Sequence, residues 1–272
     1  RTREILVWLV QKSYGGLRMA EEKKQEFKFP TEVIDLPSEG KLYPKDSPLS
    51  SGKIELKYMT AREEDILTSQ NLIEKGLVIE KLLDSLIVTE GITSDDLVLG
   101  DKNAIMVAAR ILAYGSDYTV EIDHPTRDGK IEQSFNLANC PFKKLPEGVS
   151  GNNFEVKLPL SKVTITFKIL TGKEERKINE EIKSWKKAGL GISPELTTRL
   201  KHTITSVDGN EEKEIINNFV DNLLSRDSLF LRQEIQRVSP DIDMKQEIEL
   251  GGDTVEVVIP MTVNFFWPTT LS

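Results

Sequence analysis

Few side chains in this chain of 272 residues are suited to catalysis. The imidazoles are those of His124 and His202 and the only thiol is that of Cys140, so acid–base or nucleophilic chemistry would have to pair one of them with a serine or a carboxylate. Neither histidine lies in an HExxH helix or beside a nucleophile elbow, and the sequence has no GxxxxGK[ST] or GxGxxG loop. We therefore predict that the protein is not an enzyme; a hydrolase with an unrecognised site is the alternative from another functional class.

The same residues bear on metal binding. A structural zinc ion takes four cysteine or histidine ligands, usually as closely spaced pairs, and this chain has two histidines and one cysteine. The sequence therefore predicts no bound metal, and no pattern in it indicates another cofactor.

Composition narrows the class of protein. A charged fraction of 29% and a hydrophobic fraction of 38% are typical of soluble globular proteins. The net charge of −8 argues against a role dominated by phosphate contacts, so we expect no nucleic-acid partner. The apolar run from Ile5 to Val10 is far shorter than the roughly 20 residues that span a bilayer, so we expect no membrane segment. A single cysteine fits a reducing compartment.

The elements that could position functional side chains begin with a proline-rich segment. Pro30, Pro37, Pro44 and Pro48 fix φ and remove amide donors, which excludes an ordinary helix. We predict that residues 30–52 form an extended arm whose apolar side chains insert into a groove, either of the same chain or of a neighbour. In the partner-binding interpretation the contact residues of the arm are Leu36, Pro37, Gly40, Leu42, Tyr43 and Pro44.

A helical body should follow the arm. Residues 54–59 alternate apolar and polar side chains like a half-buried strand, and Thr60 with Glu63 forms a capping box at the start of a helix. Apolar spacing predicts a core helix over residues 72–88 and a third helix from a capping Asp101 to Gly115. We expect residues 53–116 to form a unit of strand and helices. Residues 171–240 should form a second helical region, with helices at 174–187, 194–205 and 211–237, the last of them broken near Arg226.

Two hairpins complete the predicted fold. Residues 118–122 and 130–135 alternate on either side of a turn that contains Asp128-Gly129. With further strands at 154–158 and 163–169, and an exposed loop at 141–153, they define a β-hairpin module over residues 117–170. Residues 241–272 should form a C-terminal hairpin around Gly251-Gly252-Asp253. The fold class is therefore α+β, a helical body with small antiparallel β-hairpin modules and an extended N-terminal arm. We expect residues 1–29 to be an N-terminal extension, flexible or left from cloning.

The chain ends on a cluster of large rings at Phe265, Phe266 and Trp267. Each ring can bury on the order of 150 to 250 Å² of surface, so the cluster must be covered. One interpretation is that the rings close the core of the chain's own final hairpin. The other is that they form an aromatic anchor on a neighbouring subunit, because aromatic residues are enriched at interface hot spots.

Several segments taken in order resemble one family: LPSEGKLYP, KIELKYMTAREEDIL, GDKNAIMVAARILAYG, LKHTITSVDGN and FFWP. Together they are similar to the baseplate hub proteins of T-even-like contractile-tailed bacteriophages, from about residue 30 to residue 268. The resemblance implies a structural subunit of the tail baseplate hub that acts through protein–protein contacts in virion assembly. Its implied partners are other hub or tail proteins in a hetero-oligomer, and its implied location is the virion tail baseplate, with the host cytoplasm during assembly. A transient assembly chaperone absent from the mature particle is the alternative.

One departure from the family concerns metal. Proteins of this kind often carry CPxCG-like zinc knuckles in such hairpins, but here the first position reads His124-Pro125-Thr126-Arg127-Asp128-Gly129. The second reads Leu250-Gly251-Gly252-Asp253. The knuckle position near His124 and Arg127 is therefore degenerate, and this departure from the family pattern argues against a metal there.

Overall fold

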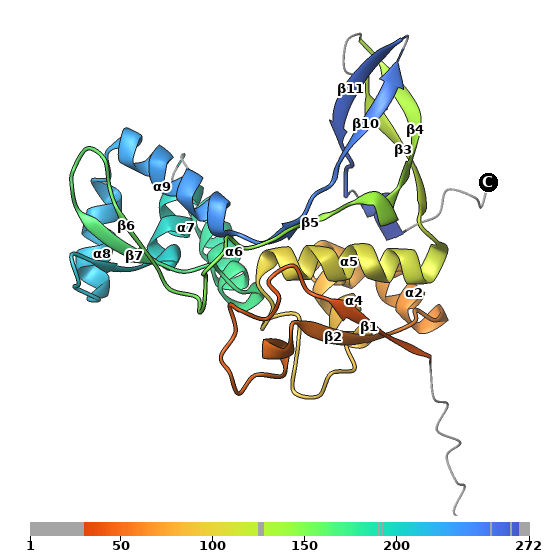
Figure 1. Cartoon of the computed structure of the whole chain (residues 1–272), viewed down its shortest axis with the longest axis horizontal. Helices are drawn as coiled ribbons and strands as arrows, with labels where there is room; N and C mark the ends of the chain where they lie inside the picture. The colour runs from red at the N-terminus through yellow and green to blue at the C-terminus, as the bar shows by residue number, and fades with distance from the viewer. Residues whose placement is uncertain are drawn as a thin grey trace, which may run out of the picture.

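A computed structural model describes residues 30–124, 128–189, 191, 193–250, 252–261 and 263–266. Within these ranges the chain combines helices with antiparallel sheets of two or three strands, which confirms the α+β fold class. Figure 1 shows three regions: a central body around helix α5 (Leu99–Tyr114), a lobe of helices and strands on one side, and a pair of hairpins that rises from the body on the other.

The body opens with a strand that the sequence analysis did not predict. β1 (Thr31–Asp35) pairs antiparallel with β2 (Lys53–Lys57), so the start of the arm belongs to a ladder. The correction has a simple reason: Pro30 and Pro37 lie outside the pairing, and residues 31–35 keep the amide donors that a ladder needs. The expected capping box at Thr60 and Glu63 is present at the start of α2 (Ala61–Thr68).

The other helices of the body differ from the prediction at two points. The helix expected over residues 72–88 is two helices, α3 (Gln70–Lys75) and α4 (Val78–Leu86), because Gly76 adopts a left-handed φ of 70° that ends the first. Helix α5 begins at Leu99 with Val98 as its N-cap, so Asp101 lies inside the first turn and is not the cap. The Asp101 side chain bonds to the arm instead of to its own backbone.

Both predicted hairpins are present. β3 (Asp117–Asp123) pairs with β4 (Lys130–Asn136), and β10 (Lys245–Leu250) pairs with β11 (Asp253–Val258). The second hairpin is shorter than expected, because β11 ends at Val258 and the chain then forms a short 3-10 helix over Val263–Phe266. In Figure 1 the two hairpins lie against each other above α5.

The lobe is built on a three-stranded sheet in the order β6 (Phe154–Lys157), β7 (Thr164–Phe167) and β8 (Ile204–Val207). Its helices are α6 (Gly172–Lys187), α7 (Glu195–Thr203), α8 (Lys213–Asp221) and α9 (Ser225–Val238). The helix expected over 194–205 thus ends at Thr203, where a β-branched run joins the sheet. The helix expected over 211–237 with a break near Arg226 is two helices, which separate between Asp221 and Ser225, close to the expected break.

A short ladder connects lobe and body. β5 (Phe142–Lys143) pairs with β9 (Asp241–Ile242), so the predicted exposed loop over 141–153 contains a strand. Beside this ladder, an added Cβ on Gly100 would lie 1.8 Å from the Pro240 carbonyl oxygen. Only a glycine allows the first turn of α5 to approach the backbone of residue 240 so closely.

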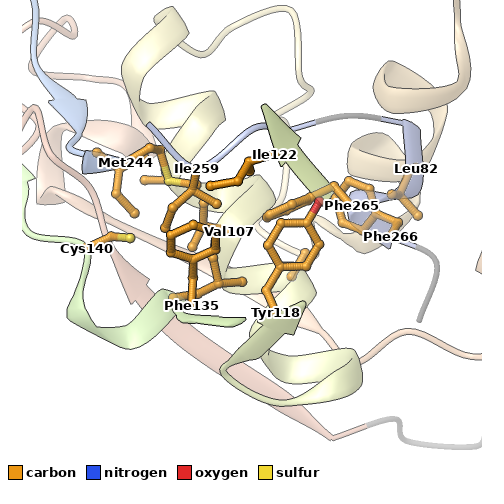
Figure 2. Packing of buried hydrophobic residues seen from close by; sticks show 14 of the residues in the cluster. Leu82, Val107, Tyr118, Ile122, Phe135, Cys140, Met244, Ile259, Phe265 and Phe266 are labelled. Carbon is orange, nitrogen blue, oxygen red and sulfur yellow. The ribbon is translucent and has the colours of Figure 1, made fainter. Parts of the chain in front are cut away.

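Three buried apolar clusters form the core of the described chain. The first joins both hairpins to α4 and α5, and Figure 2 shows its rings, with Tyr118 and Phe135 from one hairpin beside Ile259 and Phe265 from the C-terminal part. The second lies in the lobe, and the third lies between the β1–β2 ladder and helices α4 and α5.

Candidate protein-binding site

The arm residues named as partner contacts pack against their own chain. Leu36 is 1% exposed in the core between the β1–β2 ladder and α5, and Leu42 is 4% exposed in the core of the lobe. Pro37 and Gly40 are also buried, and Pro44 is exposed. Of the two alternatives that the sequence left undecided, these side chains occupy a groove of the same chain. That the arm contacts a partner stays a prediction.

A buried carboxylate holds the arm in place. Asp101 Oδ1 accepts a hydrogen bond from the Ser38 amide at 2.9 Å, and its Oδ2 accepts from the hydroxyls of Ser38 and Tyr43, each at 2.6 Å. The Tyr43 hydroxyl in turn accepts from the Val98 amide at 3.0 Å. Burial raises the pKa of Asp101, against the opposing effect of the Ser38 and Tyr43 hydrogen bonds. Burial, together with the Asp101 charge, also raises the pKa of Tyr43. The motif LPSEGKLYP therefore clamps the arm to the N-terminal turn of α5.

Two glycines let the arm fold back on itself. Gly40 has φ of 75°, and an added Cβ would lie 2.5 Å from the Ser50 carbonyl oxygen. Gly52 has φ of 72°, and its added Cβ would lie 2.8 Å from the backbone of Glu39. Each glycine is needed both for its left-handed backbone and for the close approach of the other segment.

A second buried carboxylate secures the start of α2. Glu63 is 0% exposed and accepts hydrogen bonds from Lys57 Nζ at 2.8 Å, Ser85 Oγ at 2.7 Å and the Thr60 amide at 2.8 Å. Burial alone would raise the pKa of Glu63, but the hydrogen bonds from Lys57, Ser85 and Thr60 outweigh it and lower the pKa to about 2. This network joins β2, α2 and α4.

Of the three aromatic residues near the end of the chain, the structure describes Phe265 and Phe266. Phe265 and Phe266 are 1% and 3% exposed in the hairpin core, and the Phe265 ring meets the edge of Tyr118 with centroids 5.1 Å apart. Phe265 and Phe266 therefore pack in the chain's own core, as the first of the two interpretations predicts. Trp267, the third ring of the prediction, lies outside the described residues, so its contact with a partner stays a prediction.

The residues considered for chemistry are dispersed. Cys140 is buried in the hairpin core, and His124 lies at the end of β3, while Arg127 is outside the described residues. His202 Nε2 lies 2.9 Å from a carboxylate oxygen of Glu181, but the Glu181 side chain is 53% exposed and the pair lies on the surface between α6 and α7. Among described residues, no group of three or more His, Cys, Asp or Glu side chains could hold a metal ion.

Exposed apolar side chains gather around one hollow on the body and a second between the body and the lobe. A hollow of about 480 Å³ is bordered by α3, α4, α5 and the 3-10 helix, and a second of about 210 Å³ is bordered by α5, α7 and α9. Leu99 lines both, and a third hollow between α6 and α7 shares Leu196 and Arg199 with the second. We call these three adjoining hollows together the Leu99 groove. Its exposed apolar side chains are Ile73, Leu99, Leu196 and Met261.

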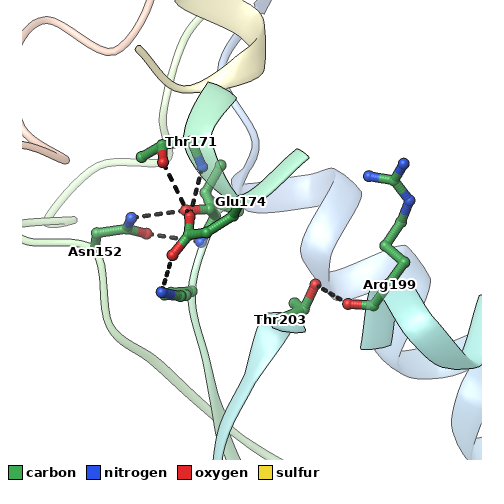
Figure 3. A network of polar contacts seen from close by, with 7 residues as sticks. Asn152, Thr171, Glu174, Arg199 and Thr203 are labelled. Atoms are coloured by element: carbon green, nitrogen blue, oxygen red, sulfur yellow. Dashed lines mark hydrogen bonds and ion pairs between the residues drawn. The ribbon is translucent and has the colours of Figure 1, made fainter. Parts of the chain in front are cut away.

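Ordered polar contacts fix the lobe side of the groove. Glu174 accepts from the Thr171 amide at 2.8 Å in a capping box at the start of α6 and pairs with Lys168. Asn152 exchanges two hydrogen bonds with the backbone of Ile169, at 2.7 and 2.8 Å. Figure 3 shows these contacts and the neighbouring Thr203–Arg199 bond. Hydrogen bonds and an ion pair therefore hold the lobe side of the groove in place.

Sequence reasoning did not find the Leu99 groove. Its four exposed apolar residues are spread from position 73 to position 261, so no local motif unites them. The available signal was an apolar residue at a helix start, Leu99, but a buried leucine would have the same sequence signature.

Comparison with known proteins yields one match. The family model described as T4 bacteriophage base plate protein matches residues 28–267. No curated protein and no solved structure matches the chain. In the part of the chain that the structure describes, no helix has the length and apolar character needed to cross a membrane.

Proposed function

Because the chain belongs to the family of T4 bacteriophage base plate proteins, we propose that it is a structural subunit of the baseplate hub. In this proposal it works through protein–protein contacts during virion assembly and catalyses no reaction. Its partners are other hub or tail proteins, and it acts in the virion tail baseplate after assembly in the host cytoplasm.

The observation that carries this proposal is the extent of the family match. Residues 28–267 include the arm, the body, the lobe and both hairpins. The baseplate assignment thus applies to the whole described architecture, not to one module of it.

The geometry supports a role based on shape. The fully buried carboxylates, Asp101, Glu63 and Asp227, accept hydrogen bonds from their own chain and join elements to one another. The Leu99 groove, by contrast, presents large apolar side chains to the surface. Exposed apolar patches of this kind mark interaction surfaces.

The test is the protein composition of particles. Mature virions are purified from cells infected with the phage that encodes the chain, and the chain is quantified by mass spectrometry against known baseplate proteins. A fixed number of copies per particle is the expected result for a hub subunit. Detection in precursor complexes but not in mature particles would reject the subunit role and favour a transient assembly chaperone.

A further inference from the structure

The charges around the Leu99 groove differ from those of the chain as a whole. The chain has a net charge of −8, yet most charged side chains that line the three adjoining hollows are cationic. The cations are Lys102, Lys168, Lys183, Lys186, Arg199 and Arg232, and the acids are Glu175 and Glu195. The groove therefore concentrates positive charge beside an apolar surface.

Most of these cations already have a partner. Lys102 pairs with Glu80, Lys168 with Glu174, Lys186 with Glu195 and Arg199 with Glu175. Arg232 and Lys183 do not: within the described ranges, neither has a carboxylate within 4.0 Å. Arg232 donates to the Ser228 carbonyl at 3.4 Å, and Lys183 donates to the Lys75 carbonyl at 3.4 Å. Both side chains are exposed, and each can accept a carboxylate from another molecule.

Helices form most of the border of the groove, which restricts the form of the ligand. The main non-helical part is Lys168–Leu170, where the Lys168 amide and the Ile169 backbone already bond to Thr203 and Asn152. The backbone groups of a helix interior are bonded within the helix, so these walls offer no strand edge to which an extended segment could add. Recognition must then use side chains. An amphipathic helix suits this arrangement, because it inserts residues at positions i, i+3, i+4 and i+7 from one face and carries charges on its flanks.

We propose that the Leu99 groove binds an amphipathic helix of a neighbouring baseplate protein. The apolar face of that helix packs on Ile73, Leu99, Leu196 and Met261, and carboxylates on its flanks pair with Arg232 and Lys183. The baseplate identity of the partner rests on the proposed function. The acidic, amphipathic character of the bound segment rests on the groove alone.

The experiment uses site-specific photocrosslinking in infected cells. A photoreactive amino acid replaces Leu196, which is 45% exposed, and the control chain carries it at Leu160, which is 51% exposed in the β6–β7 turn and lines none of the three hollows. Crosslinked peptides are identified by mass spectrometry in precursor complexes and in mature particles. The expected product joins position 196, but not 160, to an amphipathic segment with acidic flanks in another baseplate protein.

Charge variants then test the recognition. Arg232→Glu should lower the yield of that crosslink about tenfold, because like charges would face each other at the site. Arg226→Glu, a charge reversal on the same helix at an exposed residue that lines none of these hollows, should leave the yield unchanged. Reversing one flanking glutamate of the captured segment to arginine should restore the yield in the Arg232→Glu chain.

Several results would overturn the inference. They are a crosslink from position 196 to a second copy of this chain or to another part of the same chain, a captured segment without carboxylates, or a yield that Arg232→Glu leaves within twofold. The same samples separate this failure from failure of the proposed function. If mature particles contain the chain but lack the crosslink, only the groove proposal is rejected. If mature particles lack the chain, the role as a hub subunit is rejected, and the crosslink in precursor complexes then tests the groove proposal.

Discussion

The Tyr43 hydroxyl donates a hydrogen bond of 2.6 Å to Asp101 across 58 residues of sequence. Tyr43 belongs to the arm, and Asp101 belongs to the first turn of α5. Since the same hydroxyl accepts from the Val98 amide, removing it leaves both a buried carboxylate and a helix-terminal amide without one partner. The relationship makes the arm a part of the folded body.

Tyr43→Phe should therefore destabilise the protein. A hydrogen bond to a charged group contributes about 1.5–3 kcal/mol, and we expect a loss of about 2 kcal/mol in the free energy of unfolding, measured by urea denaturation. Tyr58→Phe is the matched control, because Tyr58 is half-buried and none of the hydrogen bonds described above uses its hydroxyl. Equal stability of the two variants would contradict the clamp.

Gly100→Ala should have a larger effect. The added methyl group would lie 1.8 Å from the Pro240 carbonyl oxygen, so α5 and the backbone of residue 240 would have to separate. We expect a loss of about 3 kcal/mol or more, as for other overpacked sites. Gly91→Ala is the control for backbone strain alone, since Gly91 has φ of 75° and open space around its Cβ position; it should cost roughly 1 kcal/mol. A milder effect at Gly100 than at Gly91 would exclude the close approach.

Glu63 should make stability depend on acid pH. Its pKa is about 2 in the folded protein and about 4.5 when unperturbed. Because the folded pKa is the lower one, the contribution is complete above about pH 4.5 and is lost as the pH falls toward 2. The shift corresponds to about 3 kcal/mol.

The measurement compares the unfolding free energies of the wild type and Glu63→Gln between pH 2 and pH 7. The difference between them should be largest near neutrality and shrink on acidification. Glu256→Gln, which breaks an exposed ion pair with Lys245, should show no such pH dependence. A Glu63→Gln difference that is constant with pH would refute the assigned network.

Phe265→Ala tests whether the C-terminal rings hold the hairpins together. Phe265 is 1% exposed and touches Tyr118 of the other hairpin, so its truncation should cost about 3–5 kcal/mol. Limited proteolysis should then cut the C-terminal hairpin faster. Trp185→Ala, at a ring that is 45% exposed on α6, should change neither property. If Phe265→Ala is cut no faster than the wild type, other residues anchor the C-terminal hairpin.

The sequence predicted well those elements that depend on neighbouring residues alone. Alternation over residues 118–122 and 130–135 located a real hairpin, and the Thr60–Glu63 capping box located a real helix start. Proline spacing correctly excluded α-helix from the arm, which contains one 3-10 turn at Pro48–Ser51. It gave no sign of the ladder between β1 and β2, because pairing depends on a partner segment some 20 residues away.

The candidate site was less predictable for the same reason. The Asp101 carboxylate was expected to cap its own helix, a local role, yet its partners are Ser38 and Tyr43. The exposure of Leu99 depends on how the lobe is placed against the body, which is a tertiary property. Leu36 and Leu42 were recognised as side chains that need a groove, but the sequence did not identify which molecule provides it.

The ladder between β5 and β9 has a consequence for evolution. The chain departs toward the lobe at Phe142–Lys143 and returns beside the same point at Asp241–Ile242, so the lobe is an insert with a closed stem. The entropy lost on closing a loop grows only slowly with its length, so changes in the length of the insert cost little free energy once its stem has formed. Lengthening of an exposed turn of the lobe should therefore be tolerated in evolution, whereas exchange of the whole lobe should not, because Leu42 of the arm and Val98 belong to its core.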